Sequence, residues 1–452
     1  MEVDVAPRVR QGFRFAIQEI QVEGYKSLGQ RQVIALKPLT VIAGVNSSGK
    51  SSIMQPLLLL KQTADAPYDP GPLQLDGANV SVTSIEQVLS KTLSMTARAR
   101  GFTVVVKTRT AETSVRFNKD ATGNLRVAEY SGLFLPQQKE PIFIREGMPQ
   151  TQLRKQIEPL LKDAELPDLF RRRDAKITVS RDRFMLSPAL EYTRGNNTSL
   201  IPLSFNNSGD LSEIASRVIH LPALRGNPRR TYRTAAVTDR YPGRFDTYTA
   251  GIISYWQNNK RVEKLQQLRK DVEELGLTWK IEARQVDDTQ VELLVGRLPQ
   301  ARQGGAKDLV NIADVGFGVS QTLPVVVALL AASPGQLVYL EQPEIHLHPR
   351  AQLKFAELVK RAVQRGVRVV IETHSSLFLR AAQTLIASDI MHPEDVALHW
   401  FTRDRQSGET QISTAELQPD GSFGEWPEDF DDVYLASESN YLNAAMERMP
   451  LH

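Results

Sequence analysis

The pattern of apolar and polar positions predicts an opening segment of strands followed by a helix. Three alternate residues on one face predict a half-buried strand running to Val22, namely Phe13, Phe15 and Ile17. An apolar run over 39–43 ends at Gly44, which is typical of a buried strand that feeds a loop. Residues 51–63 then predict an apolar-rich helix, made irregular by Pro56.

The final third of the chain has a strand–helix–strand pattern. Residues 337–340 and 367–371 are short, mostly apolar runs, and 351–365 between them predicts a helix rich in Lys and Arg. A strongly apolar helix is predicted just before them, over 322–332. Strand, helix and strand at this spacing predict a parallel sheet.

The middle of the chain is less regular. It predicts charged helices and short strands, at 153–173, 177–203, 258–275 and 279–298. We therefore expect an α/β ATPase-type core with a mixed sheet flanked by helices, split in sequence by a large inserted α+β or helical subdomain. The predicted parts are an N-terminal core half, an inserted arm and a C-terminal core half, over 1–90, 91–300 and 301–452.

The segment Gly44–Ser51 matches the pattern G-x-x-x-x-G-K-[ST] in full. Its glycines allow successive backbone amides to face phosphate oxygens, Lys50 supplies charge to the β and γ phosphates, and Ser51 ligates Mg²⁺. A chance match in a glycine-containing turn is the alternative, but the predicted strand before it and helix after it argue against that. The predicted ATP-binding residues here are Gly44, Asn46, Ser47, Ser48, Gly49, Lys50, Ser51 and Ser52.

Two polar groups follow the two later strands. Glu341 ends the apolar run at 337–340, where a carboxylate can hold Mg²⁺ through water, so Ser51 and Glu341 are the predicted metal residues. His374 follows the run at 367–371, where an imidazole can hydrogen-bond the γ phosphate. An ordinary strand end and a structural histidine are the alternatives, and the presence of all three motifs in order favours function.

A glycine- and serine-containing segment precedes the apolar helix. Amides and a hydroxyl at a helix start form an anion site, and the predicted contacts are Gly316, Gly318, Ser320 and Gln321. One chain cannot easily bring two such helix ends to one γ phosphate, whereas two facing chains can. A simple helix N-cap is the alternative.

Composition limits the function classes. The 55 Lys and Arg residues nearly balance the 52 Asp and Glu residues, so any nucleic-acid surface must be local. There are no cysteines, which excludes disulfides, cysteine nucleophiles and Cys-ligated zinc. No apolar signal core opens the chain, and no apolar run is long enough to span a bilayer. We expect a soluble, cytoplasmic protein that does not enter the membrane.

Other candidate groups have plain surface interpretations. The basic clusters Arg225, Arg229 and Arg230 and, separately, Arg171–Arg173 can contact phosphate or DNA, or lie in solvated loops. Asp429 and Asp431 form a D-x-D of the kind that metal nucleases use, or an acidic turn. With no cysteine and seven histidines, a zinc or HNH nuclease is poorly supported, so any nuclease is expected on a partner protein.

Four segments in this order resemble ABC-type ATPases of the chromosome-maintenance (SMC), RecF and overcoming-lysogenization-defect (OLD) group. They are the phosphate loop, the glycine–serine segment, LVYLEQPEIHLHP and VVIETHSS. The stretch EQPE and the tail GEWPEDFDD are most similar to a bacterial AAA-family branch that includes anti-phage ATPases, such as the Septu ATPase that partners an HNH nuclease. The resemblance covers about a quarter of the chain. It implies a head-to-head homodimer or higher oligomer with two ATP molecules and Mg²⁺ between the subunits. Lys26 and Ser27 would lie near the nucleotide base, and His346 and His348 near the dimer seam.

This sequence departs from that group's pattern after Glu341. Gln342 stands where the group usually has a water-activating glutamate, and an amide orients water but accepts no proton. Glu344 is the alternative base, so the predicted catalytic residues are Glu341, Gln342, Glu344 and His374. Three hypotheses remain: an ATPase that controls a partner nuclease or DNA in anti-phage defence, a slow or non-hydrolysing nucleotide-gated scaffold, and a RecF-like DNA-repair ATPase.

Overall fold

A six-stranded mixed sheet forms the centre of the molecule. The computed structural model describes residues 15–92, 97–133, 140–163, 176–194, 197–202, 210–234, 238–298 and 308–423, with residue 439. The sheet order is β11-β16-β17-β3-β18-β19, and β18 and β19 are its antiparallel pair. The bounds are β11 Ile219–Leu221, β16 Leu337–Glu341, β17 Arg368–Glu372, β3 Leu39–Gly44, β18 Val396–Arg403 and β19 Thr410–Ala415. Because β11, β16, β17, β3 and β18 run parallel, their carboxyl ends meet at one edge.

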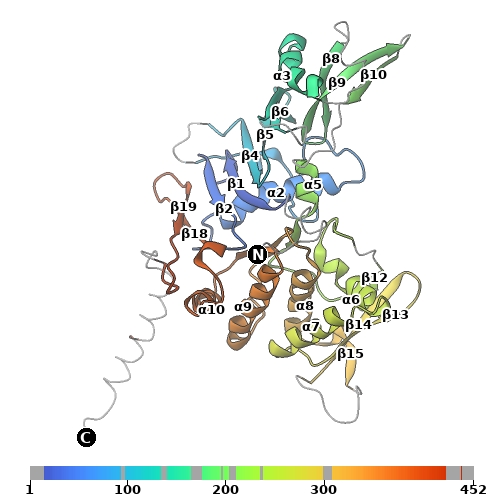
Figure 1. The fold of residues 1–452 in the computed structure, drawn as a ribbon, viewed down its shortest axis with the longest axis vertical. Helices are drawn as coiled ribbons and strands as arrows, with labels where there is room; N and C mark the ends of the chain where they lie inside the picture. The colour runs from blue at the N-terminus through green and yellow to red at the C-terminus, as the bar shows by residue number, and fades with distance from the viewer. Residues whose placement is uncertain are drawn as a thin grey trace.

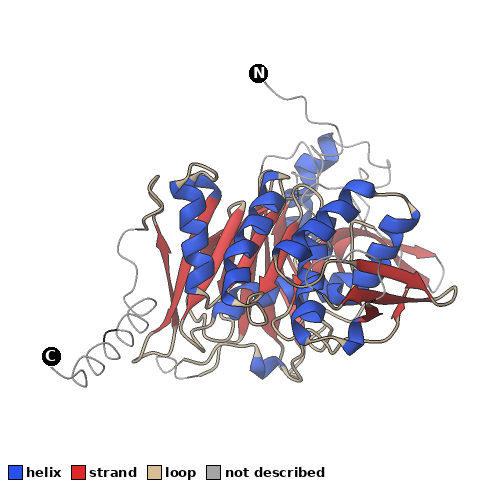
Figure 2. Ribbon diagram, turned by 90° about the horizontal axis from the view of Figure 1, so that it is seen from below, coloured by secondary structure: helices blue, strands red, loops and turns tan. Residues whose placement is uncertain are grey.

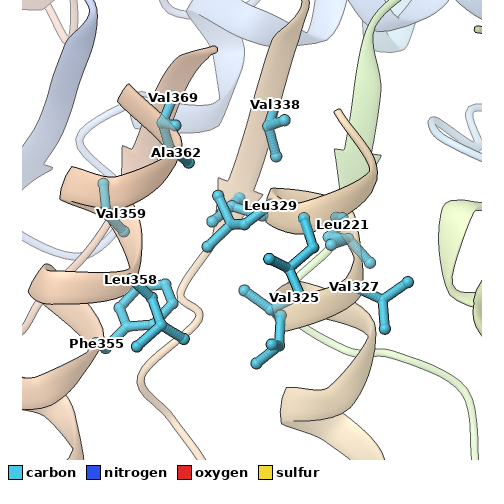
Figure 3. Packing of buried hydrophobic residues seen from close by; sticks show 14 of the residues in the cluster. Leu221, Val325, Val327, Leu329, Val338, Phe355, Leu358, Val359, Ala362 and Val369 are labelled. Atoms are coloured by element: carbon cyan, nitrogen blue, oxygen red, sulfur yellow. The ribbon is translucent and has the colours of Figure 1, made fainter. Parts of the chain in front are cut away.

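Helices pack along this sheet (Figure 2). They are α2 Lys50–Asp65, α8 Phe317–Ala331, α9 Pro349–Gln364 and α10 Ser376–Ala387. Figure 3 shows Leu329 of α8 and Val359 of α9 among the buried side chains beside Val338 and Val369 of the strands. These four side chains are buried because apolar helix faces and apolar strand faces exclude water together.

A second, antiparallel sheet lies beside the first, and the two share α2 in one apolar core. Its order is β2-β1-β4-β5-β6-β7. The bounds are β1 Ile17–Glu23, β2 Gln32–Ala35, β4 Gly101–Thr108, β5 Glu112–Lys119, β6 Leu125–Gly132 and β7 Ile142–Arg145. The predicted mixed α/β fold with helices flanking a sheet is therefore confirmed.

Smaller units occupy the two ends of the molecule (Figure 1). One end carries α3 Gln150–Asp163, β8 Lys176–Asp182, β9 Met185–Arg194 and β10 Asn197–Pro202, and α5 Leu211–Ser216 lies nearer the centre. The other carries β12 Tyr232–Arg233, α6 Thr249–Asn258, α7 Val262–Glu274, β13 Ile281–Gln285, β14 Gln290–Gly296 and β15 Leu309–Asn311. Short 3₁₀ helices are η1 Ile85–Gln87, η2 Phe245–Tyr248, η3 Ile312–Asp314 and η4 Pro393–Asp395.

Several elements differ in detail from the sequence predictions. Pro56 does not interrupt α2, and α8 begins at Phe317 rather than at 322. Strands from within 91–300 pair with strands outside it, β4 with β1 and β11 with β16. The division at 91 and 300 therefore cuts through shared sheets, and these boundaries stay a prediction. Among the described residues, no helix combines the length and the apolar character needed to cross a bilayer.

Candidate functional site

The loop between β3 and α2 requires glycine at both ends of its pattern. Gly44 has φ 146°, and a Cβ there would lie 2.2 Å from the Phe401 carbonyl oxygen. Gly49 has φ 96°, and a Cβ there would lie 2.3 Å from the Thr410 hydroxyl. Any other residue would meet both positive φ and a clash, so the loop keeps its tight curl only with these glycines.

The Lys50 side chain folds back onto the start of this loop. Its ammonium donates to the carbonyl of Val45 at 2.8 Å and to that of Gly44 at 3.1 Å. Burial lowers the pKa of Lys50, and the negative charge of Glu372 acts in the opposite direction. A cation held against loop carbonyls can transfer to a stronger acceptor such as a phosphate oxygen.

The loop leaves several donors free. Among the described residues, the backbone amides of Asn46, Ser47 and Gly49 have no hydrogen-bond partner. The buried Ser48 hydroxyl has none either. A tightly curled loop with free backbone donors beside an ammonium is the arrangement of an anion site.

Ser51 contacts a carboxylate that the sequence predictions did not include. Its hydroxyl donates to Glu372, with Oγ 2.9 Å from Oε2 and 3.1 Å from Oε1. The Tyr339 hydroxyl donates to the same Oε2 at 3.0 Å. Burial raises the pKa of Glu372, and the charge of Glu341 raises it further. Since β17 lies between β16 and β3, Glu372 is one strand closer to the loop strand than Glu341.

Glu341 is held from the opposite side, by β11 and the turn after it. The His220 Nε2 lies 3.1 Å from Glu341 Oε1, and the Ala223 amide donates to Oε2 at 3.3 Å. His220 is itself fixed by Asn79, 3.1 Å from Nδ1, and by stacking on Tyr339. Burial raises the pKa of Glu341, but the interactions with His220, followed by the hydrogen bond from the Ala223 amide, act in the opposite direction, and the net pKa is lowered. The Glu341 carboxylate is therefore kept ionised at the end of β16, two strands from β3.

Gln342, predicted to orient water, and Glu344, the predicted alternative base, have the following contacts. Gln342 has φ 43°, and its backbone amide donates to the backbone carbonyl of Glu372 at 2.7 Å. The buried Glu344 accepts from the Thr373 hydroxyl at 2.7 Å and from the His374 amide at 2.9 Å. Glu344 therefore holds the turn that carries His374.

His374 lies exposed at the sheet edge, next to the loop lysine. Partial burial lowers the pKa of His374, and the positive charge of Lys50 lowers it further. The ring is therefore neutral near pH 7, so one ring nitrogen can donate a hydrogen bond and the other can accept one.

The glycine–serine segment forms the first turn of α8. Gly316 is the N-cap, and Ser320 donates to the Phe317 carbonyl at 3.2 Å. The Gln321 side chain is buried and donates to the Gly226 carbonyl at 3.1 Å. Ser320 and Gln321 are thus used within the chain, whereas the prediction placed them as anion contacts before the helix.

Arg225 joins this segment to the carboxylate strand. Its guanidinium donates to the carbonyl of Gln321 at 3.0 Å and to that of Glu341 at 3.3 Å. Burial lowers the pKa of Arg225 to about 10, although Asp246 and other nearby carboxylates act against this. The interpretation of Arg225 as part of a solvated loop is wrong, because it is buried between α8 and β16.

The remaining predicted residues lie around this edge. Ser27 is buried behind the loop, with its hydroxyl oxygen 2.7 Å from that of Thr410. Lys26 donates to Gln55 of α2 at 2.6 Å. The His346 carbonyl lies 3.5 Å from the position of a Cβ on Gly318. Ser52 is buried in α2, and His348 caps α9. Arg229 is exposed, and Arg230 forms an ion pair with Asp314. The remaining predicted residues lie outside the described part of the chain, namely Arg171–Arg173, Asp429 and Asp431.

Sequence reasoning missed Glu372, His220 and Thr410. Glu372 stands two residues before His374 and pairs in register with Glu341, so the end of the second strand was the available signal. His220 and Thr410 carry no such signal, because each meets the site only through sheet pairing between distant segments. The Thr410 hydroxyl donates to the Ser48 carbonyl at 2.7 Å and so holds the phosphate loop in place.

Comparison with known proteins adds a family match. Residues 189–380 match a family described as "AAA domain, putative AbiEii toxin, Type IV TA system". This span contains the segment at 316–321, Glu341 and His374, and it begins after the phosphate loop. It indicates an AAA-type ATPase domain and, with it, nucleotide binding in general. No curated protein matches the chain.

Three solved structures of SMC heads are similar at low identity. A Smc head bound to the C-terminal winged-helix domain of ScpA has 12% identity and a TM-score of 0.47, covering 89% of this chain and 98% of that chain. The SMC head domain from Thermotoga maritima has 12% identity and a TM-score of 0.40, covering 89% and 99%. A Smc head with an extended coiled coil, bound to the C-terminal domain of ScpA derived from Pyrococcus furiosus, has 10% identity and a TM-score of 0.44, covering 94% and 99%.

Proposed function

We propose that this protein is an ATPase that binds ATP with Mg²⁺ at Gly44–Ser51. The observation that carries the proposal is the row of free loop amides beside Lys50, at the edge where the carboxyl ends of parallel strands meet. Lys50 would release the loop carbonyls and take up the β and γ phosphates. His374, neutral and exposed beside Lys50, would donate to the γ phosphate.

The oxygen atoms at this edge of the sheet are of the kind that ligates magnesium. The Ser51 hydroxyl and the Glu372 carboxylate already meet, and Glu341 pairs in register with Glu372 on the next strand. Burial raises the pKa of Glu372 and repulsion by the neighbouring Glu341 carboxylate raises it further, and a divalent cation would relieve that repulsion. Mg²⁺ when bound would neutralise charge that develops on the phosphates.

We propose that ATP joins two subunits through this same edge. Four large apolar side chains are exposed there, each following a core strand or opening α8: Val45, Leu224, Phe317 and Ile345. An exposed apolar rim around a polar site is typical of a surface that a second protein covers. A second copy of the chain would bring its own α8 start to the phosphates bound by the first.

Sedimentation equilibrium with Mg·ATP, with ADP and without nucleotide tests the dimer. We expect the wild type to form dimers with Mg·ATP and to stay monomeric with ADP or without nucleotide. The Phe317→Arg/Ile345→Arg variant should stay monomeric in Mg·ATP while it still binds ATP. Ile390→Arg is the matched control, because Ile390 is also exposed but follows α10, at the opposite edge of the sheet. Monomers of the wild type at all nucleotide conditions would contradict the proposal.

We further propose that nucleotide-driven dimerisation controls a partner effector, a nuclease or DNA, in anti-phage defence. The sequence features EQPE and GEWPEDFDD support it, and the unit with α3 and β8–β10 offers a surface at one end of the molecule for that partner (Figure 1). The test is co-purification with the product of the neighbouring reading frame, with and without Mg·ATP. Recovery of a nuclease in an ATP-dependent complex would support it, and the absence of any nucleotide-dependent partner would count against it.

A slow, nucleotide-gated scaffold is the second candidate function. It is favoured by Gln342, which accepts no proton, and by Glu344, whose Oε1 already accepts from Thr373 and His374. Phosphate release separates the two functions. Turnover of about 1 s⁻¹ or faster that disappears in Lys50→Ala would exclude the scaffold, and a Gln342→Glu variant that gains about tenfold or more in rate would support it.

A further inference from the structure

A cavity of about 380 Å³ lies beside the first turn of α8, outside the phosphate loop. Its walls come from the segment after β11, from β12, from η2 and from α8. We call it the arginine pocket and define it by Arg225, Arg229, Arg233, Arg244, Tyr232 and Tyr248. Its volume falls within the range of small-molecule sites.

The charge of the arginine pocket is unbalanced. Four guanidinium groups line it and one carboxylate, Asp246, opposes them. Asp246 is engaged by Arg244 through two bonds of 3.0 Å. Arg229 and Arg233 are exposed at the cavity, with no acidic partner for either side chain among the described residues. Like charges are held together here at a cost that an anion would relieve.

Arg225 forms the buried part of the pocket wall. Its side chain is only 6% exposed, and its Nε has no hydrogen-bond partner among the described residues. Buried guanidinium donors are normally satisfied, because an unmet charged donor costs more than a hydrogen bond returns. The Arg225 Nη1 and Nη2 already donate to the carbonyls of Gln321 and Glu341, so the planar donor forks open to a phosphate group are those of the exposed Arg229 and Arg233.

We infer that the arginine pocket binds a phosphorylated small molecule as a second ligand, separate from the ATP of the phosphate loop. The phosphate would lie among the guanidinium groups, and the rest of the molecule would lie against the rings of Tyr232 and Tyr248. A ligand in the arginine pocket would be connected to the nucleotide site through Arg225 and Ser320. Arg225 donates to the Glu341 carbonyl and the Gln321 carbonyl, and Ser320 lines the same cavity.

Calorimetric titration of the full chain tests binding. The probes are inorganic pyrophosphate and AMP, titrated into Lys50→Ala, whose phosphate loop is disabled. We expect either probe to bind, with AMP binding more tightly than pyrophosphate if the tyrosine rings contribute. Arg229→Gln/Arg233→Gln in the same background should weaken binding by about tenfold or more, since two charge-assisted contacts are lost.

The control is Arg230→Gln. Arg230 belongs to the same loop and pairs with Asp314, and it lines the neighbouring groove but not the arginine pocket. We expect its affinity for the probes to stay within about twofold of the parent. The inference is overturned if neither probe binds Lys50→Ala at up to about 5 mM. It is also overturned if Arg230→Gln weakens binding as much as the double variant, or if an oligonucleotide binds at the same arginines and AMP does not.

A second readout tests the link to the nucleotide site and rests on the proposed ATPase function. A compound that only competes with ATP raises KM and leaves kcat unchanged. We expect AMP to change kcat of the wild type as well, and not that of Arg229→Gln/Arg233→Gln. A purely competitive effect would remove the link while leaving the binding result intact, and an absence of ATP turnover would count against the proposed function and not against the pocket.

Discussion

The Ser51 hydroxyl donates to the Glu372 carboxylate, with Oγ 2.9 Å from Oε2. The carboxylate that the motif pattern selects, Glu341, instead accepts from His220 and the Ala223 amide. Strand order explains the difference, because β17 separates β16 from β3. The two glutamates are neighbours across the sheet, and the one on the inner strand reaches the loop.

Glu372→Gln should therefore weaken binding of Mg·ATP by about tenfold and leave binding in the presence of EDTA unchanged. The carboxamide keeps the shape and an acceptor for Ser51 but removes the charge that a cation needs. Fluorescence titration of a labelled ATP with and without Mg²⁺ measures this. Glu357→Gln on α9 is the control, since that carboxylate lies on the helix surface with Lys360. Equal Mg²⁺ dependence in Glu372→Gln and the wild type would contradict a metal role for Glu372.

Glu344 distinguishes a positioning role from a base. Glu344→Gln keeps a carbonyl oxygen for the Thr373 hydroxyl and the His374 amide, whereas Glu344→Ala leaves both donors without an acceptor. We expect the rate of phosphate release to stay within about threefold in Glu344→Gln and to fall about a hundredfold in Glu344→Ala. If Glu344→Gln is as inactive as Glu344→Ala, the residue is the base.

How far the sequence predicts this site depends on distance along the chain. The loop at Gly44–Ser51 is one continuous segment whose spacing is set by local geometry, so its strand and helix follow directly. Glu372 and His220 meet Ser51 and Glu341 only through parallel pairing of strands that are far apart in sequence. No local pattern encodes that order.

The same limit applies to helix ends. The apolar run at 322–332 locates the body of α8, but Phe317 and Gly318 carry no helix signal, and the helix begins there with Gly316 as its cap. Tertiary contacts decide the start, since Gln321 is fixed by Gly226 and Arg225. A sequence-based boundary at 322 leaves Ser320 before the helix, where the structure has it in the first turn.

His399 should make folding stability depend on pH. It is buried and neutral, with Nε2 donating to the Ala35 carbonyl at 2.8 Å and Nδ1 2.9 Å from the Thr414 hydroxyl. Burial lowers its pKa, and the charge of Lys37 adds to this against the effect of Ala35. Below the ordinary pKa of about 6.5 the unfolded chain gains a proton that the folded chain does not, so stability falls as pH drops below that value.

The measurement is urea unfolding of the wild type and His399→Gln at about pH 7.5 and pH 5.5. The difference in free energy of unfolding between the two proteins should shrink at the lower pH, by at most about 1.4 kcal/mol per pH unit. Other titrating groups contribute equally to both proteins and cancel in the difference. A difference that is the same at both pH values would show that His399 titrates alike in the folded and unfolded chain.

The central claim is that Gly44–Ser51 binds ATP, and Lys50→Ala tests it most directly. The hydrogen bonds of the Lys50 side chain in the described structure go only to loop carbonyls, so we expect the variant to fold, which its unfolding midpoint checks. Lys37→Ala is the matched lysine control, away from the loop on the strand connection before β3. Equilibrium titration with Mg·ATP should give saturable binding to the wild type and to Lys37→Ala, and binding at least about a hundredfold weaker to Lys50→Ala. Equal affinity of the wild type and a folded Lys50→Ala for ATP would contradict the account.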